Sequence, residues 1–234
     1  MIFIASQLFA CVTETGNPEY DFQGSLVALA RTSSPADVGA GAGRRAEPRV
    51  VVDQAAITLR EIRFEEAGSC GGGGRSEADI EGPWTVELIQ AGALPLELAV
   101  RSFCRLRLRL DRAEGGVHDD RSVSIEGTRR DGTPFVIESR ATPELELRAE
   151  GGEPFQIDDE ALDLLLAFDL AGWLAFDLDV LSPGGDGTIR IDDDTNDGAL
   201  DQFEDALEDS LQLFEDTQGD RDVADGDTPL AAAP

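Results

Sequence analysis

The stretch 104–110, which reads Cys-Arg-Leu-Arg-Leu-Arg-Leu, carries the clearest structural signal in the chain. Apolar and charged residues alternate, so the leucines share one face with Cys104 and the three arginines share the other. A period of two is typical of a β-strand with one buried face. The arginine face has two interpretations: a ligand site, or a surface that pairs with acids on neighbouring strands, which is the commoner arrangement.

Similar alternating or apolar runs recur along the chain and predict further strands. They lie at 26–30, 50–62, 84–88, 96–100, 123–126, 135–139, 145–147, 155–157, 176–180 and 188–191. Asp131-Gly132 between two of these runs predicts a tight hairpin. The run 162–170 fits either a central strand or a short helix. Short strands with regular turn signals predict a mainly β protein, specifically an antiparallel β-sandwich, with a C-terminal amphipathic α-helix.

Composition indicates a folded but strongly acidic chain. Hydrophobic residues make up 41% of it, which is enough to form a core. With 48 acidic against 19 basic residues, all of them arginine, the formal net charge is −29. Such a chain is repelled by nucleic acid, whose binding depends on neutralising phosphates, and by anionic lipid surfaces. Cations, basic partners or solubility are what this charge favours.

The first eleven residues, Met-Ile-Phe-Ile-Ala-Ser-Gln-Leu-Phe-Ala-Cys, resemble the end of a bacterial lipoprotein signal peptide. The resemblance implies that Cys11 is lipidated after cleavage. The positive leader is missing and the apolar run is short, which a start codon placed too far downstream would explain. The alternative is a buried strand with a free thiol. The polar residues 12–19 have the composition of a tether. We therefore expect export to the periplasm, outer membrane or cell surface, with membrane attachment only through an N-terminal lipid anchor.

Three parts are expected along the chain. Residues 1–22 form the signal remnant and tether, 23–190 the β-sandwich domain, and 191–234 an acidic loop, a helix and a disordered tail. Cys70 stands in a glycine-rich loop and Cys104 on a core-facing strand. Because an exported protein meets an oxidising environment, we expect a disulfide between them. The alternative is two unpaired buried thiols.

The middle of the chain, roughly 50–181, resembles an uncharacterised family of bacterial lipoproteins with a transthyretin-like or carbohydrate-binding-like β-sandwich. Predicted lipoproteins of myxobacteria belong to it. The resemblance rests on Ala-Ile-Thr-Leu-Arg-Glu-Ile at 56–62, Val-Glu-Leu-Ile at 86–89 and Arg-Leu-Arg-Leu at 105–108. Phe-Asp-Leu at 168–170 and Trp-Leu at 173–174 add to it. It implies a fold and a location, and no known activity.

Residues 193–204 match a twelve-residue calcium-binding loop. Oxygen ligands are needed at positions 1, 3, 5, 7, 9 and 12, with glycine at position 6. The corresponding residues are Asp193, Thr195, Asp197, the carbonyl of Ala199, Asp201 and Glu204, with Gly198 at the turn. The alternative is that these acids cap a helix and favour its dipole. Leu200, Phe203, Leu207, Leu211 and Phe214 are expected on one face of the helix that follows.

Nothing in the sequence indicates an enzyme. His118 is the only histidine, no serine stands in a Gly-x-Ser-x-Gly motif, and a chain without lysine has no phosphate-binding Gly-Lys motif. We therefore expect a cell-envelope lipoprotein that acts as a binding or structural module, with calcium stabilising the C-terminal loop. Its partner is a protein or a glycan at the cell surface. The alternative is a carbohydrate-binding module, with Trp84, Trp173 and Tyr20 as stacking candidates.

Overall fold

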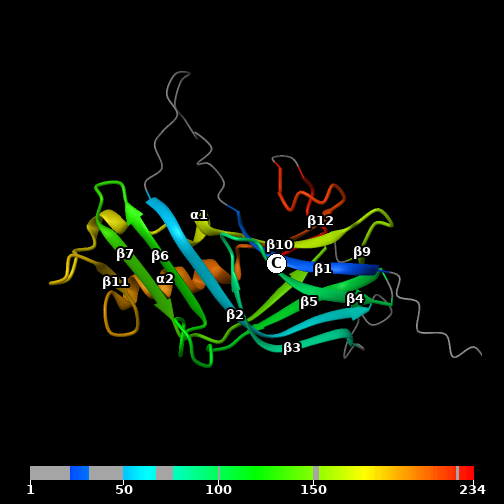
Figure 1. The fold of residues 1–234 in the computed structure, drawn as a ribbon, viewed down its shortest axis with the longest axis horizontal. Coiled ribbons are helices and arrows are strands. Elements are labelled where there is room, and N and C mark those ends of the chain that lie inside the picture. The colour runs from blue at the N-terminus through cyan, green and yellow to red at the C-terminus, as the bar shows by residue number, and fades with distance from the viewer. Residues whose placement is uncertain (1–21, 32–49, 67–75, 100, 150–152, 225–226) are drawn as a thin grey trace, which may run out of the picture.

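The structure, a computed structural model, describes residues 22–31, 50–66, 76–99, 101–149, 153–224 and 227–234. The described chain is mainly β (Figure 1). Its strands are β1 (Phe22–Arg31), β2 (Val50–Glu66), β3 (Ser76–Glu87), β4 (Gly92–Leu98), β5 (Ser102–Leu110), β6 (Val123–Arg129), β7 (Pro134–Ser139), β8 (Glu144–Arg148), β9 (Phe155–Gln156), β10 (Asp163–Asp169), β11 (Ile189–Ile191), β12 (Leu211–Asp216) and β13 (Ala231–Ala232). The helices are α1 (Leu170–Trp173), the 3₁₀ turn η3 (Leu178–Val180) and α2 (Asp197–Glu208).

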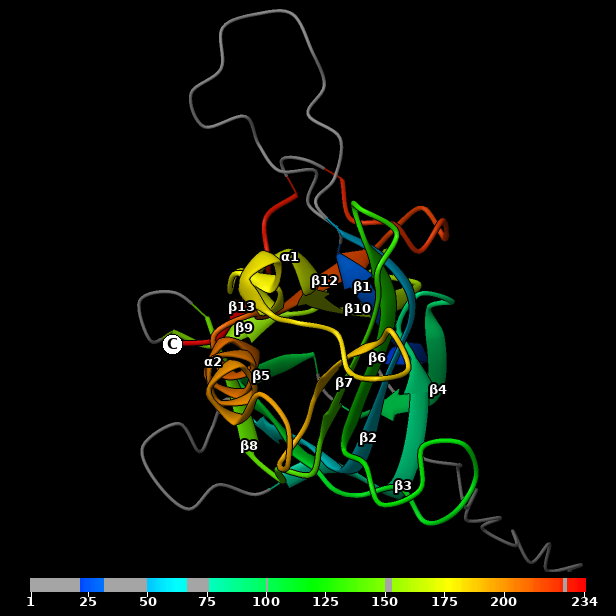
Figure 2. The same ribbon diagram turned by 90° about the vertical axis from the view of Figure 1, so that its left-hand side faces the viewer.

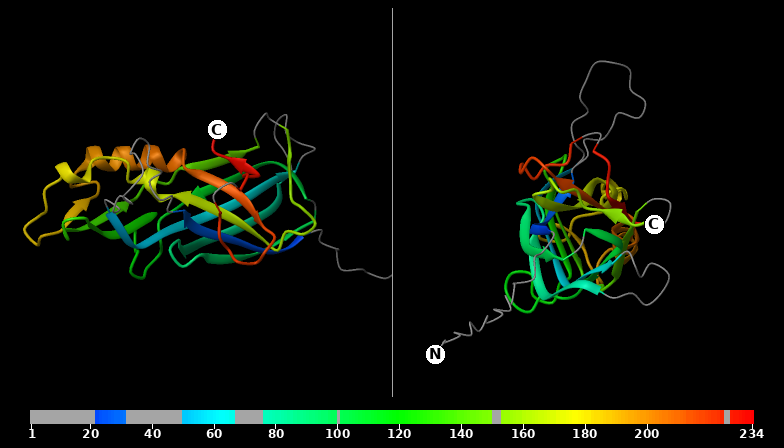
Figure 3. Two further views of the ribbon diagram at one scale, coloured as in Figure 1. Left: turned by 90° about the horizontal axis from the view of Figure 1, so that it is seen from above. Right: turned by 90° about the vertical axis from the view of Figure 1, so that its right-hand side faces the viewer.

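The described strands join in one mixed sheet, where we expected an antiparallel sandwich. The order is β11-β7-β6-β2-β5-β8-β13-β12-β10-β1-β4, with β3 added to β2 and β9 to β5. Two pairs, β1 with β10 and β11 with β7, are parallel. The sheet curls around its own core when seen along the long axis (Figure 3).

Strand β2 causes much of this curl because it belongs to two parts of the sheet. Its first half pairs with β6 and its second half with β5, while β3 lies along its other edge. The ladder between β2 and β5 shifts register between Leu59 and Glu61 and again between Glu65 and Glu66. The first shift makes Arg60 an extra residue in β2, and because such a β-bulge bends a strand and increases its twist, β2 can serve both parts.

The second of these bulges changes which side chain of β5 enters the core. Leu106, Leu108 and Leu110 are buried, as the alternation predicted. At the bulge, however, Glu66 lies opposite Phe103 and Glu65 opposite Arg105, so Cys104 is the extra residue of the bulge. Phe103 therefore takes the buried position, and Cys104 is half-buried instead of core-facing.

Strand β10 lies inside the sheet, with β1 on one side and β12 on the other. All five residues from 164 to 168 are buried, because both faces of this strand are covered. Continuous apolar runs are typical of strands covered on both faces. The chain then turns at once into α1, so the ambiguous run 162–170 is a strand up to Asp169.

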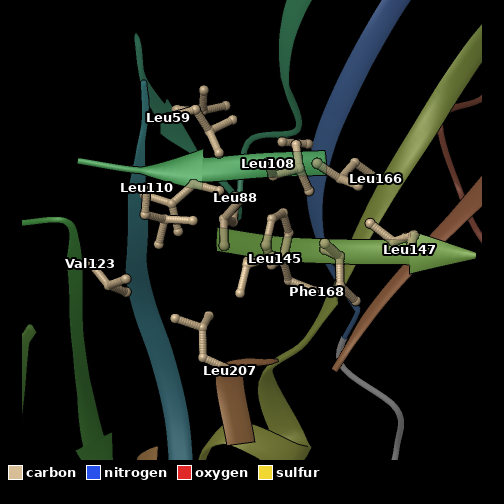
Figure 4. Packing of buried hydrophobic residues seen from close by; sticks show 14 of the residues in the cluster. Leu59, Leu88, Leu108, Leu110, Val123, Leu145, Leu147, Leu166, Phe168 and Leu207 are labelled. Carbon is tan, nitrogen blue, oxygen red and sulfur yellow. The ribbon is translucent and has the colours of Figure 1, made fainter. Parts of the chain in front are cut away.

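The core fills the inside of the curled sheet and is closed on one side by α2. Figure 4 shows Leu108 and Leu110 of β5, Leu145 and Leu147 of β8, and Leu207 of α2 within one cluster of buried residues. Phe168, Trp173 and Phe203 stack edge to face, with ring centroids 5.5 and 5.6 Å apart. These contacts join β10, α1 and α2.

The acidic C-terminal segment forms part of the sheet. Helix α2 buries Leu200, Phe203 and Leu207 as expected but ends at Glu208. Leu211 and Phe214, expected on the same helix face, belong to β12. Acids at a helix C-terminus oppose its dipole, and Glu208 and Asp209 stand at this end. In place of the expected disordered tail at 228–234, the chain adds β13 between β12 and β8.

Candidate functional site

Three loops lie at the end of the molecule that faces the viewer in Figure 2, spread from one end of the β6–β7 hairpin to the other. They are the turn 130–133, the loop 174–188 that contains η3, and the loop 192–196 that precedes α2. We call this region the loop end. Two neighbouring hollows open there, of about 560 and 630 Å³. Preformed concave surfaces with converging polar groups are the usual places for ligands.

Arg129 fixes the shape of the loop end. Its guanidinium donates hydrogen bonds to the carbonyl oxygens of Leu178, at 3.1 Å, and Leu181, at 3.4 Å. On its other side it binds the Asp131 carboxylate, with Nε 3.1 Å from Oδ1. The hydrogen bond to Asp131 raises the pKa of Arg129, and Arg129 in turn lowers the pKa of Asp131. One arginine therefore ties the hairpin turn to the η3 loop.

The hairpin turn itself forms as its sequence predicted. Gly132 adopts φ +87°, a conformation that glycine accepts without strain. The Asp131 carboxylate accepts a hydrogen bond from the backbone N–H of Thr133 at 3.0 Å. The Asp-Gly pair therefore supplies both the turn and the acid that holds Arg129.

The first hollow lies between the η3 loop, β11 and the start of α2. Its wall carries hydroxyl, amide and backbone groups from Ser182, Gly184, Gly185, Thr188, Thr195 and Asn196, next to the apolar Val180 and Leu181. Val180 is 71% exposed at this rim. Asp186 and Arg190 complete the wall as an ion pair at 2.9 Å. The surface therefore offers both donors and acceptors of hydrogen bonds.

Local hydrogen bonds hold this wall in place. Asp186 also accepts from the backbone N–H of Thr188 at 3.0 Å, and Arg190 and Thr188 together lower the pKa of its carboxyl. The Asn196 amide donates to the carbonyl of Arg190 at 2.7 Å. Sequence reasoning missed this site, although Gly-Gly-Asp-Gly at 184–187 signals a tight turn before a strand.

The second hollow is acidic. It is lined by Arg130, Asp131, Asp177 and Asp179. The Asp177 carboxylate accepts from the backbone N–H of Asp179 at 3.1 Å and so caps η3. Asp179 lies 3.9 Å from Arg129. The acids at this hollow therefore also stabilise the loops that form it.

The six predicted calcium ligands lie at one side of the loop end but do not surround a common point. Helix α2 begins at Asp197, which is position 5 of the predicted loop, so Asp197, Ala199, Asp201 and Glu204 are helical. Asp197, Asp201 and Glu204 therefore follow one another along one face of the helix, about 10 Å from first to last, instead of surrounding one point. Asp201 is exposed, and Thr195 lines the first hollow.

The two ends of this motif already have partners on β7 and the residue after it. The Asp193 carboxylate accepts from Arg140 at 3.1 Å, and the Glu204 carboxylate accepts from the Ser139 hydroxyl at 2.6 Å. Among the described residues, no group of three or more His, Cys, Asp or Glu side chains could hold a metal ion. The arrangement does not fit a calcium ion, which needs six to eight oxygens around it. Calcium binding stays a prediction.

The cysteine predictions fall largely outside the described residues. Cys11 and Cys70 lie there. The Cys104 sulfur is 3.0 Å from the carbonyl oxygen of Glu66, the last residue of β2. Lipidation of Cys11 and a disulfide between Cys70 and Cys104 stay predictions.

The arginine face of β5 pairs with acids on the strands beside it. Glu65 of β2 is almost fully buried and lies 2.5 Å from Arg105 and 3.3 Å from Arg107. Glu146 of β8 lies 3.1 Å from Arg107. Burial opposes ionisation of Glu146, but the arginines around it hold its pKa below the ordinary value. The second interpretation of this face, pairing across strands, is confirmed for Arg105 and Arg107.

The remaining candidate side chains are separate from the loop end. The His118 imidazole Nε2 lies 3.0 Å from Glu87 on β3. Trp173 is buried in the core, whereas Trp84 is 45% exposed, with its indole N–H donating to the carbonyl of Glu81. Tyr20 lies outside the described residues. Of the described stacking candidates, Trp84 is therefore the one that a ligand can reach.

Comparisons of the chain with models of protein families, with curated proteins and with solved structures gave no match. None of the described helices is long and apolar enough to cross a membrane.

Proposed function

We propose that the chain is a lipid-anchored module of the bacterial cell envelope that binds its partner through the loop end. The observation that carries the binding role is the first hollow, which is open, mixed in polarity and held in place by the contacts of Arg129, Asp186 and Asn196. Because these contacts exist without a ligand, binding would require little ordering of the loops, which is favourable for affinity.

The use of the reactive side chains supports a binding role over a catalytic one. His118 contacts Glu87, the Ser139 hydroxyl bonds Glu204, and the arginines of β5 hold glutamates. A nucleophile and a base within hydrogen-bonding reach of one another are the usual sign of covalent catalysis. Ser139 is fully buried, so a substrate cannot reach its hydroxyl, and these pairs link strands, loops and the helix, which is a structural use.

The anchor and the location rest on the sequence. Leu8, Phe9, Ala10 and Cys11 resemble a lipoprotein cleavage site, and a polar tether follows. Metabolic labelling with a clickable fatty acid in a bacterial host tests this. Label is expected on the wild-type chain, extended upstream by a lipoprotein leader, and not on Cys11→Ser. Equal labelling of the wild-type chain and of Cys11→Ser would overturn the proposed lipid anchor at Cys11.

The first hollow can be tested by filling it. A Cβ added at Gly185 meets no atom within 4 Å, and φ at this residue is not positive. Gly185→Trp should therefore fold normally and fill the hollow with its ring. The soluble chain from Val12 onward would be screened on an array of bacterial envelope glycans and purified envelope proteins. Loss of a signal with Gly185→Trp, but not with Gln23→Trp at the exposed residue of β1, supports the loop end.

A carbohydrate-binding module with a different site is the second candidate. It is favoured by Trp84, whose half-exposed ring is held by its hydrogen bond to Glu81 and packs over Gly82. Aromatic rings with fixed orientation offer an apolar face to a ligand. On the same array, loss of glycan binding with Trp84→Ala and not with Gly185→Trp would support this site over the loop end.

A further inference from the structure

The C-terminal strand β13 fills a gap in the sheet. Among the described residues, β8 and β12 are not paired with each other, and the sheet passes between them only through Ala231 and Ala232. We call this gap the β13 slot. Ala231 is buried in the main core, and Leu230 packs against the core from the side. Figure 2 shows β13 next to β12.

The strand has two residues, of which Ala231 is buried. Leu230 and Ala233 donate backbone hydrogen bonds to Leu213 and Leu211 of β12, at 2.7 and 3.0 Å. Only Ala232 pairs with β8, at Arg148. Strands with so few buried apolar contacts open before the rest of a structure. When β13 leaves, the edges of β8 and β12 expose unpaired backbone groups, which readily accept another strand.

We propose that the β13 slot is a strand-acceptor site, and that segment 230–233 of a second copy of this chain enters it in exchange. The slot fits an extended segment with small side chains, and Leu-Ala-Ala-Ala at 230–233 is the segment that fits it here. A second copy presents this same segment in the same register. Exchange of an identical element adds no new contact and is therefore close to neutral in free energy.

The hinge for this exchange lies after Arg221. The Asp216 carboxylate accepts backbone hydrogen bonds from Gln218, Gly219 and Arg221, which fixes the first part of the connection to β12. Beyond Arg221 the described residues make local hydrogen bonds, such as that from the Ala224 backbone N–H to the Asp227 carboxylate at 2.8 Å, and eight residues from 222 to 229, when extended, would span about 25 Å. The net charge of −29 opposes contact between copies. High salt, which screens this repulsion, should therefore favour exchange.

Cysteine cross-linking separates exchange from chance collision. Gln212 and Ala232 lie opposite each other in the β12–β13 ladder. The soluble chain carrying Gln212→Cys would be mixed with a copy carrying Ala232→Cys at high salt under mild oxidation. A disulfide-linked heterodimer whose yield rises with protein concentration is expected. In a single chain carrying both substitutions, an intramolecular disulfide is expected when the protein is dilute, where exchange is least.

Two controls decide the outcome. Adding Ala231→Asp to the Ala232→Cys copy places a charge in the buried position, so the heterodimer should be lost. Gln23→Cys, exposed on β1, should give only background dimer with Ala232→Cys. Absence of the heterodimer, or an equal yield with Gln23→Cys, would overturn exchange. Absence of the intramolecular disulfide in the double variant would overturn the β13 slot itself.

Discussion

Trp173 joins the sheet to α2, and replacing it gives the sharpest test of the core. Its side chain is 0% exposed and stacks between Phe168 and Phe203. Trp173→Ala removes both ring contacts and leaves a cavity, which costs about 3–5 kcal/mol. A domain of this size has about 5–15 kcal/mol of stability in total. We therefore expect a large loss of folded protein at moderate urea concentrations.

Trp173→Phe separates the ring from its indole N–H. Phenylalanine keeps an aromatic ring between Phe168 and Phe203 but loses volume and the hydrogen bond to the Ser210 hydroxyl. That hydroxyl also bonds the carbonyl of Leu207, so it is not left unpaired. The expected cost is about 1–2 kcal/mol.

Urea unfolding followed by far-UV circular dichroism measures both variants. Trp84→Ala is the matched control, because it makes the same chemical change at a side chain that is 45% exposed. We expect it to cost about 1 kcal/mol or less. The reasoning is refuted if Trp173→Ala costs no more than Trp84→Ala, or if Trp173→Phe costs as much as Trp173→Ala.

Three further predictions concern charge. Asp205 is exposed on α2, with Asp201 and Asp209 four residues away on either side. Because like charges at this spacing repel, Asp205→Lys should raise the free energy of unfolding by about 0.5–1 kcal/mol at low salt, measured by urea unfolding. An unchanged or lower urea midpoint would contradict this. The sequence predicts that calcium stabilises the motif at 193–204, whereas the partners of Asp193 and Glu204 in the structure predict that millimolar calcium leaves the melting temperature where it is in EDTA. A rise that Glu204→Gln abolishes would show that the motif binds the metal. The pKa of Asp186 is lowered in the folded chain, so the stability that the Asp186 carboxylate contributes is present at neutral pH and is lost as the pH falls below about 4 through the folded pKa. Asp186→Asn should therefore accelerate hydrogen exchange of the Thr188 amide at pH 7 but not at a pH where Asp186 is already protonated. Equal acceleration at both pH values would refute this prediction.

Local patterns in the sequence predict the strands but not their order. The alternation at 106–110 and the Asp-Gly turn at 131–132 depend on neighbouring residues, and both are observed. The parallel pairing of β1 with β10 joins residues about 140 positions apart, for example Leu26 with Leu164. No local pattern encodes such a contact. The mixed sheet could therefore not be inferred, and the expected antiparallel sandwich was the simpler arrangement of the same strands.

Segments that satisfy two patterns at once were predicted less well. Leu211 and Phe214 continue the helical spacing of Leu207, and Leu211 and Leu213 also have the spacing of a strand. The segment that contains them pairs with the edge of β10 and therefore forms the strand β12. Cys104 fits the alternation of β5, but the bulge opposite Glu65 and Glu66 gives its position to Phe103. Tertiary context decides both cases.

The loop end was missed because its key contacts are between distant residues. Arg129 bonds carbonyl oxygens about 50 positions away, and backbone carbonyls leave no mark on the sequence. The acidic motif at 193–204 had the residue types of a calcium loop. Sequence could not show that Ser139 and Arg140 contact its two ends.

The most direct test of the central proposal is binding of the soluble chain to arrayed envelope glycans and proteins, compared among wild type, Gly185→Trp and Gln23→Trp. The account predicts a ligand that wild type and Gln23→Trp bind alike and that Gly185→Trp loses, with unchanged melting temperatures for all three. A ligand that Gly185→Trp binds as well as wild type does would contradict the loop end as the binding face.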